Sequence, residues 1–239
     1  MSAQNHDDHL HYHGPEGHHH NHVHFVREEI MCHLPYAIFS VAFGLAILSF
    51  LAYSACVSAT HNTAVCMGSH ILFHSFHFMH IVFAATGTMI TFLRFSNKVA
   101  KAFVIGALST MLFCTLSDAI LPYVGGLILG VDMHFHLCFL TELSNVLPFL
   151  VVGLCNGYLM SRHDSSRQGT YSIFSHFVHI LISSFASIFY LVSNGFTDWY
   201  LSIGPVFVFL VFAVVVPCTM SDVVVPMMFA GADKAHEKH

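Results

Sequence analysis

Six long apolar stretches constrain the fold of this chain more than any other feature of its sequence. A helix needs roughly 20 residues to cross the hydrocarbon core of a bilayer, which is about 30 Å thick. Each stretch reaches that length and lacks the two-residue alternation of a membrane β-strand, so we expect helices. The expected spans are residues 31–55, 69–93, 101–126, 135–160, 172–194 and 201–229. The sequence therefore predicts an all-α integral membrane protein with six transmembrane helices.

The composition agrees with this class of protein and excludes two others. Of the 239 residues, 55% are hydrophobic and only 9% are charged, which excludes an ordinary soluble domain and a nucleic-acid-binding protein. The formal net charge of −5 says little about partners, because 22 histidines gain charge as the pH falls through about 6.5. The lipid bilayer is therefore an expected partner and nucleic acid is not, and the composition is compatible with a homo-oligomer.

Lysine and arginine occur in the connections on one side of the predicted membrane. The loops after the first, third and fifth spans contain neither residue. Because basic residues are retained on the cytoplasmic side, we expect both termini in the cytoplasm. The basic residues are Arg27, Arg94, Lys98, Lys101, Arg162, Arg167, Lys234 and Lys238. The sequence thus predicts a multi-pass protein, which we expect in the inner membrane of the cell.

The two halves of the chain carry the same three polar signatures in the same order. The signatures read Glu-(Ile/Leu)-x3-Leu-Pro, His-Phe-x-His-Ile and Cys-Thr-x-Ser-Asp-x3-Pro. They begin at Glu29 and Glu142, at His77 and His176, and at Cys114 and Cys218. Each half has three spans, and three is odd, so the second half enters the membrane from the opposite side. The sequence therefore predicts two inverted three-helix repeats, related by a twofold axis in the membrane plane.

This organisation divides the chain into four parts. They are a cytoplasmic tail (1–28), the first repeat (29–130), the second repeat (131–230) and a short cytoplasmic tail (231–239). Nine histidines lie between His6 and His24, in a segment with too few apolar residues to bury a core. We expect the first tail to be disordered and to bind metal ions with low specificity.

The topology gathers the repeated polar residues into two predicted clusters. Helical rise puts them roughly 10–16 Å below one membrane surface or the other. The outer cluster comprises His77, His80, Asp118 and Glu142, and the inner cluster comprises Glu29, His176, His179 and Asp222. His70 and His74 extend the outer cluster toward the external surface, where His134 and His136, at the outer start of the fourth span, are expected to complete an entry funnel.

Each predicted cluster combines two histidines on one helix face with carboxylates from two other helices. Imidazole and carboxylate together form an N2O2 ligand set, which suits divalent transition metals. A carboxylate is costly inside a membrane unless it is paired, protonated or bound to a metal. The sequence therefore predicts a metal site in each cluster, with the ion as the substrate of the protein.

Other roles for these residues stay open at the level of sequence. A lone membrane histidine more often makes a hydrogen bond between helices. Asp118 and Asp222 can act as helix caps. Pro122 and Pro226 each follow an aspartate by four residues, which predicts broken helices at matched positions beside the site.

The cysteines divide into two sets. Those in or beside the spans are expected to be small apolar fillers, with a ligand role as an option. Cys56 and Cys66 lie in the first external loop, where a disulfide and two free thiols are equal alternatives.

The interpretation that accounts for both clusters is a proton-coupled transporter of a divalent transition metal, which is iron, zinc, nickel, cobalt or manganese, rather than an enzyme. One alternative is a haem-binding electron-transfer subunit with axial histidines from the second and fifth spans. Another is a membrane hydroxylase or hydrolase that uses the histidine run from His70 to His80. The plan resembles small six-span transporters with inverted three-helix repeats. The HxxxxDH helix of nickel and cobalt permeases is absent.

Overall fold

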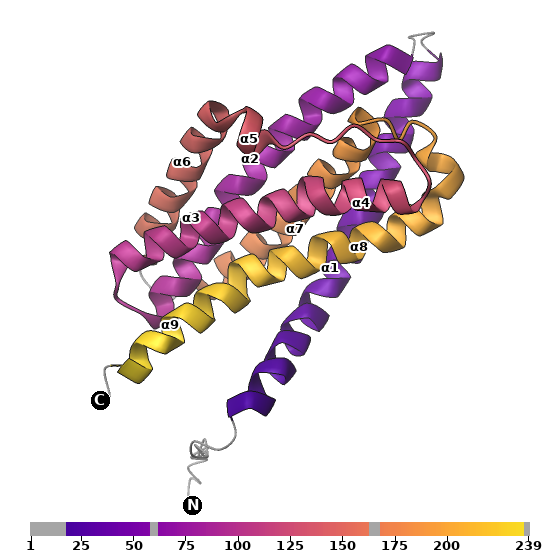
Figure 1. Ribbon diagram of the computed structural model, residues 1–239. Coiled ribbons are helices and arrows are strands. Elements are labelled where there is room, and N and C mark those ends of the chain that lie inside the picture. The colour runs from indigo at the N-terminus through magenta and orange to yellow at the C-terminus, as the bar shows by residue number, and fades with distance from the viewer. Residues whose placement is uncertain (1–17, 58–61, 163–167, 237–239) are drawn as a thin grey trace, which may run out of the picture.

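The computed structural model describes residues 18–57, 62–162 and 168–236, and the regular elements within those ranges are all helical (Figure 1). Seven of them, in chain order, are α1 (His18–Val57), α2 (Asn62–Phe95), α3 (Val99–Thr115), η2 (Leu116–Ile120), α4 (Leu121–Ile128), α5 (Cys138–Thr141) and α6 (Leu143–Ser161). The remainder are α7 (Gln168–Ser193), η4 (Trp199–Ser202), α8 (Ile203–Thr219), η5 (Met220–Val224) and α9 (Val225–His236).

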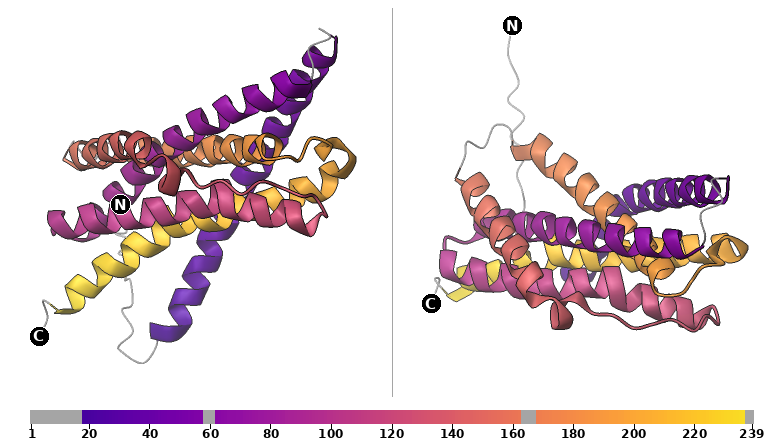
Figure 2. Two further views of the ribbon diagram at one scale, coloured as in Figure 1. Left: turned by 45° about the horizontal axis from the view of Figure 1, so that its top comes forward. Right: turned by 90° about the horizontal axis from the view of Figure 1, so that it is seen from above.

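Six helices in the described part of the chain are long and apolar enough to cross a membrane, which confirms the expected all-α, multi-pass class. Four of the six spans are single helices, namely α1, α2, α6 and α7. The other two are composite, because α3, η2 and α4 run on as one helix, as do η4, α8, η5 and α9. These two composite helices lie side by side and run in opposite directions in Figures 1 and 2.

The fourth span differs from the sequence expectation at its beginning. We expected a helix from residue 135, but α6 begins at Leu143. The preceding segment is held in a non-helical conformation by the end of α7. The backbone N–H of His134 donates to the carbonyl of Asn194 (2.9 Å), and that of His136 donates to the Tyr190 hydroxyl (3.1 Å). Glu142 therefore lies at the start of the span instead of well inside it.

The first span begins earlier than expected. Helix α1 starts at His18, so residues 18–28, which we expected to belong to a disordered tail, are helical. Residues 1–17, with the first histidines of the tail, lie outside the described residues. The side chains of Cys56 and Cys66 also lie outside them, so the disulfide alternative there stays a prediction.

Two π-helical turns replace the expected helix breaks. Proline lacks an N–H group and its ring clashes with the carbonyl four residues earlier in an α-helix. Before Pro122 and Pro226 the helix widens: Leu121 N–H donates to the Leu116 carbonyl, five residues back, and Val225 repeats the pattern. The helix axis continues through both wide turns, η2 and η5. Such turns are often found at functional sites.

Helices α2 and α7 form the centre of the molecule. They pack against each other, and each also packs against the first helix of the other half: α2 against α6, and α7 against α1. The π-turn η5 lies on α2, and η2 lies on α7. The fully buried side chains include Phe73 and Met89 from α2 and Phe189 and Tyr190 from α7. Polar groups on the facing sides of α2 and α7 are therefore buried inside the protein.

Small residues let α6 approach α2 closely. Gly153 and Gly157 are four residues apart, the spacing that brings helix backbones together in membranes. A Cβ atom at Gly153 would lie 2.7 Å from the carbonyl oxygen of Val82. The Thr86 hydroxyl donates to the Gly153 carbonyl (3.0 Å). The contact thus depends on a missing side chain at Gly153.

Replacing Gly153 by alanine is expected to destabilise the protein by about 1–3 kcal/mol, because the new methyl group meets the backbone of α2 and forces the helices apart. The measurement is thermal unfolding of the purified protein in detergent. Gly204→Ala is the matched control, because a Cβ atom there meets nothing within 4 Å. Equal unfolding temperatures for the two variants would contradict this account of the contact.

Candidate metal centre

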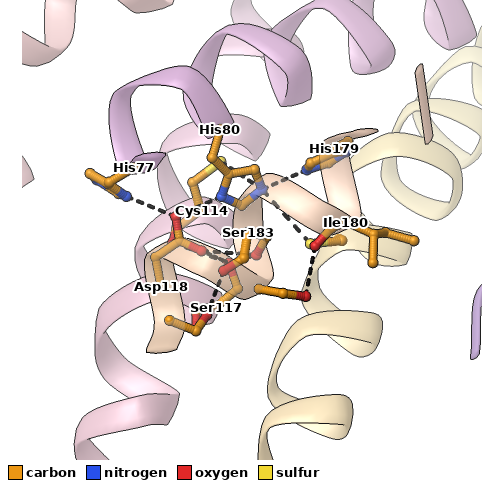
Figure 3. A network of polar contacts seen from close by, with 11 residues as sticks. His77, His80, Cys114, Ser117, Asp118, His179, Ile180 and Ser183 are labelled. Carbon is orange, nitrogen blue, oxygen red and sulfur yellow. Dashed lines mark hydrogen bonds and ion pairs between the residues drawn. The ribbon is translucent and has the colours of Figure 1, made fainter. Parts of the chain in front are cut away.

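Four buried ionisable side chains form a continuous hydrogen-bonded row. Figure 3 shows three of them, Asp118, His80 and His179. His80 on α2 and His179 on α7 face each other, with their Nε2 atoms 2.5 Å apart. On the far side of each ring, Nδ1 donates to a carboxylate. His80 donates to Asp118 Oδ2 (2.6 Å), and His179 donates to Asp222 Oδ2 (2.5 Å). We call Asp118, His80, His179 and Asp222 the central row.

The π-turns bring the aspartates of the central row to the histidines. Asp118 lies in η2 and Asp222 in η5, and the exposed fraction of these residues is 0% and 3%. The turn η2 contacts α7 and the turn η5 contacts α2, so each composite span brings one carboxylate to the central helices. A buried carboxylate needs hydrogen-bond donors or a positive partner, and the imidazoles supply them here.

Two buried thiols lie beside the histidine pair. The Sγ atoms of Cys114 and Cys218 are each 3.8 Å from His80 Nε2. The potential ligand atoms of His80, His179 and Cys218 all lie within 4.8 Å of one another. Both cysteines precede the aspartate of their own helix by four residues, so thiol and carboxylate project from nearby points on that helix.

The two aspartates differ in their remaining partners. Asp118 accepts four hydrogen bonds: His77 (2.9 Å) and His80 bind Oδ2, while the hydroxyls of Ser117 (2.8 Å) and Ser183 (2.9 Å) bind Oδ1. Figure 3 shows these donors pointing at one carboxylate. Asp118 is therefore held rigidly, with both oxygens occupied.

Asp222 has fewer partners than Asp118. Its Oδ1 has no hydrogen-bond partner among the described residues. Gly87 on α2 leaves room for this carboxylate, since a Cβ atom at that position would lie 2.9 Å from Asp222 Oδ2. The half of the centre that contains Asp222 is thus less completely bonded.

A second set of candidate ligands lies at the start of α6. It comprises His70, His74, His136, Cys138 and Glu142, which we call the Glu142 group. The Nε2 atoms of His74 and His136 lie 2.9 and 3.7 Å from Glu142 Oε1. Neither nitrogen has a hydrogen-bond partner among the described residues, because the His136 contact is too long for a hydrogen bond and the His74 contact is poorly aligned for one. The potential ligand atoms of His74, His136 and Cys138 lie within 4.8 Å of one another.

This group is accessible from outside the molecule. His70, His74 and Glu142 line an open pocket, together with Asn145. The ring centroids of His70 and His74 are 4.3 Å apart. Imidazole and carboxylate ligands that converge in a pocket can bind a divalent transition metal.

Charge and burial shift the pKa of two members of the Glu142 group. Burial raises the pKa of Glu142, but the hydrogen bond from Asn145 and the nearby His74 outweigh it, so the pKa is lowered overall. Burial lowers the pKa of His136, and His74 lowers it further, while Glu142 raises it. The net result is a pKa below the ordinary 6.5, so His136 keeps its neutral, metal-binding form to a lower pH than an ordinary histidine.

A third set lies on α1 and α7. His33 Nδ1 donates to the backbone carbonyl of Glu29 (2.6 Å) and lies 3.9 Å from its carboxylate. The rings of His33 and His176 are in contact, with centroids 5.2 Å apart. We call Glu29, His33 and His176 the Glu29 group. In the sequence repeat, Glu29 is equivalent to Glu142 and His176 is equivalent to His77.

The structure brings the predicted residues together differently from the two predicted clusters. The central row combines residues from both predicted clusters: His80 and Asp118 from the outer one, and His179 and Asp222 from the inner one. His77 lies beside the row and binds Asp118. Glu142 joins His70 and His74 at the start of α6, while Glu29 and His176 lie beside His33. The two-cluster arrangement is therefore wrong. Estimated depths along single helices do not reveal that α2 and α7 pack together, which brings the two His-Asp pairs into contact.

Sequence reasoning missed several residues of these sites. It treated the span cysteines as apolar fillers, whereas Cys114 and Cys218 lie beside the histidine pair. The signal was present, because a cysteine begins each copy of the third repeated signature. His33 and Cys138 have no counterpart of the same residue type in the other half of the chain, so the repeat did not identify them.

Comparisons with protein-family models, with curated proteins and with solved structures find no match to this chain. The chemistry of the site therefore rests on its own geometry.

Replacing Glu142 by glutamine is expected to lower the pKa of His136 further, because the carboxylate that favours the imidazolium form is removed. The measurement is an NMR titration of the histidine side chains in detergent. Glu29→Gln, in the separate Glu29 group, is expected to leave the His136 titration unchanged. A His136 pKa that rises in the Glu142 variant would contradict the electrostatic account of this group.

Proposed function

We propose that the protein transports a divalent transition-metal ion across a membrane. The observation that carries the proposal is the central row, in which buried metal-ligating side chains from both halves meet between the two central helices. Ionisable groups are rare and costly in membrane-spanning segments, and they commonly mark the paths of ions. Candidate ligand groups at two further places, the Glu142 group and the Glu29 group, give the ion a point of arrival and a point of departure.

An inverted repeat is part of this proposal. A twofold axis in the membrane plane that exchanges the halves would exchange α2 with α7 and α6 with α1. The contacts follow that rule, since α2 packs on α6 and η5 while α7 packs on α1 and η2. The contact between His80 and His179 then lies on the axis. Transport sites of inverted-repeat proteins are found at such an interface, near the middle of the bilayer.

The ligand groups are spaced along the central helices at distances that suit a series of steps. His70 and His80 are both on α2, about 15 Å apart at 1.5 Å per residue. His77, which binds Asp118, lies between these two histidines on α2. Beyond the centre, Asp222 on η5 binds His179 on α7, and His176 of the Glu29 group lies three residues before His179 on the same helix. An ion moving along this path meets nitrogen or oxygen ligands at each stage.

Protons and the metal ion compete for the same atoms in the centre. Both Nδ1 atoms of the pair donate to carboxylates, so the close Nε2 contact requires a hydrogen shared between the two rings. A metal ion binds through the Nε2 lone pairs and has to displace that hydrogen. This competition supports coupling of metal movement to proton movement.

The distribution of basic residues supports an orientation with both termini in the cytoplasm. In that orientation the Glu29 group faces the cytoplasm, and the Glu142 group faces the opposite side. The histidine-rich start of the chain is then on the cytoplasmic side, where we propose that its histidines bind ions. We propose the inner membrane of the cell as the location.

The geometry favours transport over the two alternatives. Haem held by His80 and His179 would need their Nε2 atoms about 4 Å apart, twice a metal–nitrogen bond, and they are 2.5 Å apart. A metalloenzyme site built from the whole histidine run is also disfavoured. The run divides between two places, because His74 contacts Glu142 whereas His77 and His80 contact Asp118.

Asp118→Asn and Asp222→Asn are each expected to lower metal flux into proteoliposomes by about 10–100-fold or more, because the carboxylates orient the metal-binding imidazoles. Flux is measured per folded protein with a metal-sensitive dye inside the vesicles. Asp132→Asn, at an exposed loop residue, is the matched control and is expected to keep full flux.

Deleting residues 1–17 is expected to change the flux only modestly, because α1 and the three ligand groups remain. Full flux in both the Asp118→Asn and the Asp222→Asn variant would contradict the proposal that the ion passes through the central row.

A further inference from the structure

Two buried thiols, those of Cys114 and Cys218, lie beside the histidine pair of the central row. We infer that Cys114 and Cys218 complete a four-ligand site with His80 and His179, and that its substrate is a thiophilic divalent ion of the zinc class. This inference deepens the proposed function by naming the substrate class, and it rests on that function for the movement of the ion.

Three of the four ligand atoms are already gathered, since those of His80, His179 and Cys218 lie within 4.8 Å of one another, and Cys114, which is outside that set, is the fourth. A tetrahedral zinc ion with Zn–S bonds of about 2.3 Å and Zn–N bonds of about 2.0 Å needs its sulfur and nitrogen ligands about 3.6 Å apart. Both Sγ atoms lie 3.8 Å from His80 Nε2. The two Nε2 atoms, now 2.5 Å apart, need to separate to about 3.3 Å. Admitting the ion therefore takes a shift of less than 1 Å between the rings together with an inward movement of the Cys114 thiol.

The carboxylates act behind the histidines instead of on the metal. Asp118 and Asp222 each accept a hydrogen bond from the Nδ1 atom of a ring, which leaves Nε2 directed at the centre. This is the carboxylate–histidine–metal arrangement found around bound zinc. Asp118 has both oxygens occupied by four donors, so it has no free position for the ion.

The ligand set therefore changes from the N2O2 predicted by the sequence to N2S2. Oxygen ligands suit manganese, whereas two thiolates and two imidazoles in a tetrahedral arrangement are typical of zinc. The sequence repeat supports the same set, because Cys114 and Cys218 are equivalent in the two halves, as are His80 and His179. The other described span cysteines, Cys32 and Cys155, are exposed.

Sulfur also provides a signal that is specific to this site. The histidine-rich tail binds metal through nitrogen, and no cysteine precedes Cys32 in the chain. A thiolate signal therefore comes from the helical part of the protein. Cys138 in the Glu142 group is the one competing candidate ligand among the described cysteines, and it can be replaced separately.

The first experiment loads the full-length, reduced protein with Co²⁺, which reports thiolate ligands by charge-transfer absorption in the near ultraviolet. Cys114→Ser and Cys218→Ser are each expected to remove roughly half of the centre's band, because each removes one of its two thiolates. Cys155→Ser is the matched control and is expected to keep the full band. Cys138→Ser reports the share of the Glu142 group. A band unchanged in both central variants overturns the inference.

X-ray absorption of the unaltered protein with substoichiometric Zn²⁺ keeps the test independent of variant folding. The expected neighbours are sulfur at about 2.3 Å and nitrogen at about 2.0 Å. A spectrum with nitrogen and oxygen neighbours alone overturns the sulfur site.

Flux measurements then separate this inference from the proposed function. Proteoliposomes are expected to take up Zn²⁺ in preference to Mn²⁺, and the double serine variant is expected to lose zinc flux on the order of 10-fold or more. Preferred uptake of Mn²⁺ overturns the substrate class while leaving transport in place. Thiolate absorption without flux of any metal supports the sulfur site and overturns the transport proposal.

Discussion

The structure depends on one constraint, which is that a charged side chain cannot remain alone in an apolar interior. Asp118 and Asp222 are buried between helices, and each is bound by an imidazole from a central helix. Each imidazole has a second nitrogen that needs a partner, and the two second nitrogens meet. Satisfying the carboxylates thus requires α2 and α7 to pack face to face, with η2 and η5 directed at them.

Local features of the helices serve this centre. The π-turns before Pro122 and Pro226 direct the aspartates toward the histidines without interrupting either span. Gly87 leaves space for the Asp222 carboxylate. The halves are equivalent in their ligands and unequal in their support, because Asp118 accepts bonds from Ser117 and Ser183 whereas one oxygen of Asp222 has no hydrogen-bond partner among the described residues.

Much of the fold was predictable from the sequence, and the site was predictable in part. The spans followed from apolar length, which depends on each segment alone. The start of the fourth span was wrong, because the segment before α6 bonds to the distant end of α7 through Tyr190 and Asn194. The repeated His and Asp residues were identified by their pattern. Their separation into two clusters was wrong, because depth along one helix carries no information on its neighbours.

The sequence by itself determined six apolar helices, a duplicated set of polar signatures and the residue types available for a metal site. Those properties are local or periodic, so they can be recognised in the sequence without knowing how the helices pack. The tertiary structure decided which copies of the signatures meet. It joined His80 to His179 across the halves, brought Cys114 and Cys218 beside them, and left Glu29 and Glu142 in separate groups. The reason is that ligand geometry arises between helices, where the contacts join residues far apart in the chain.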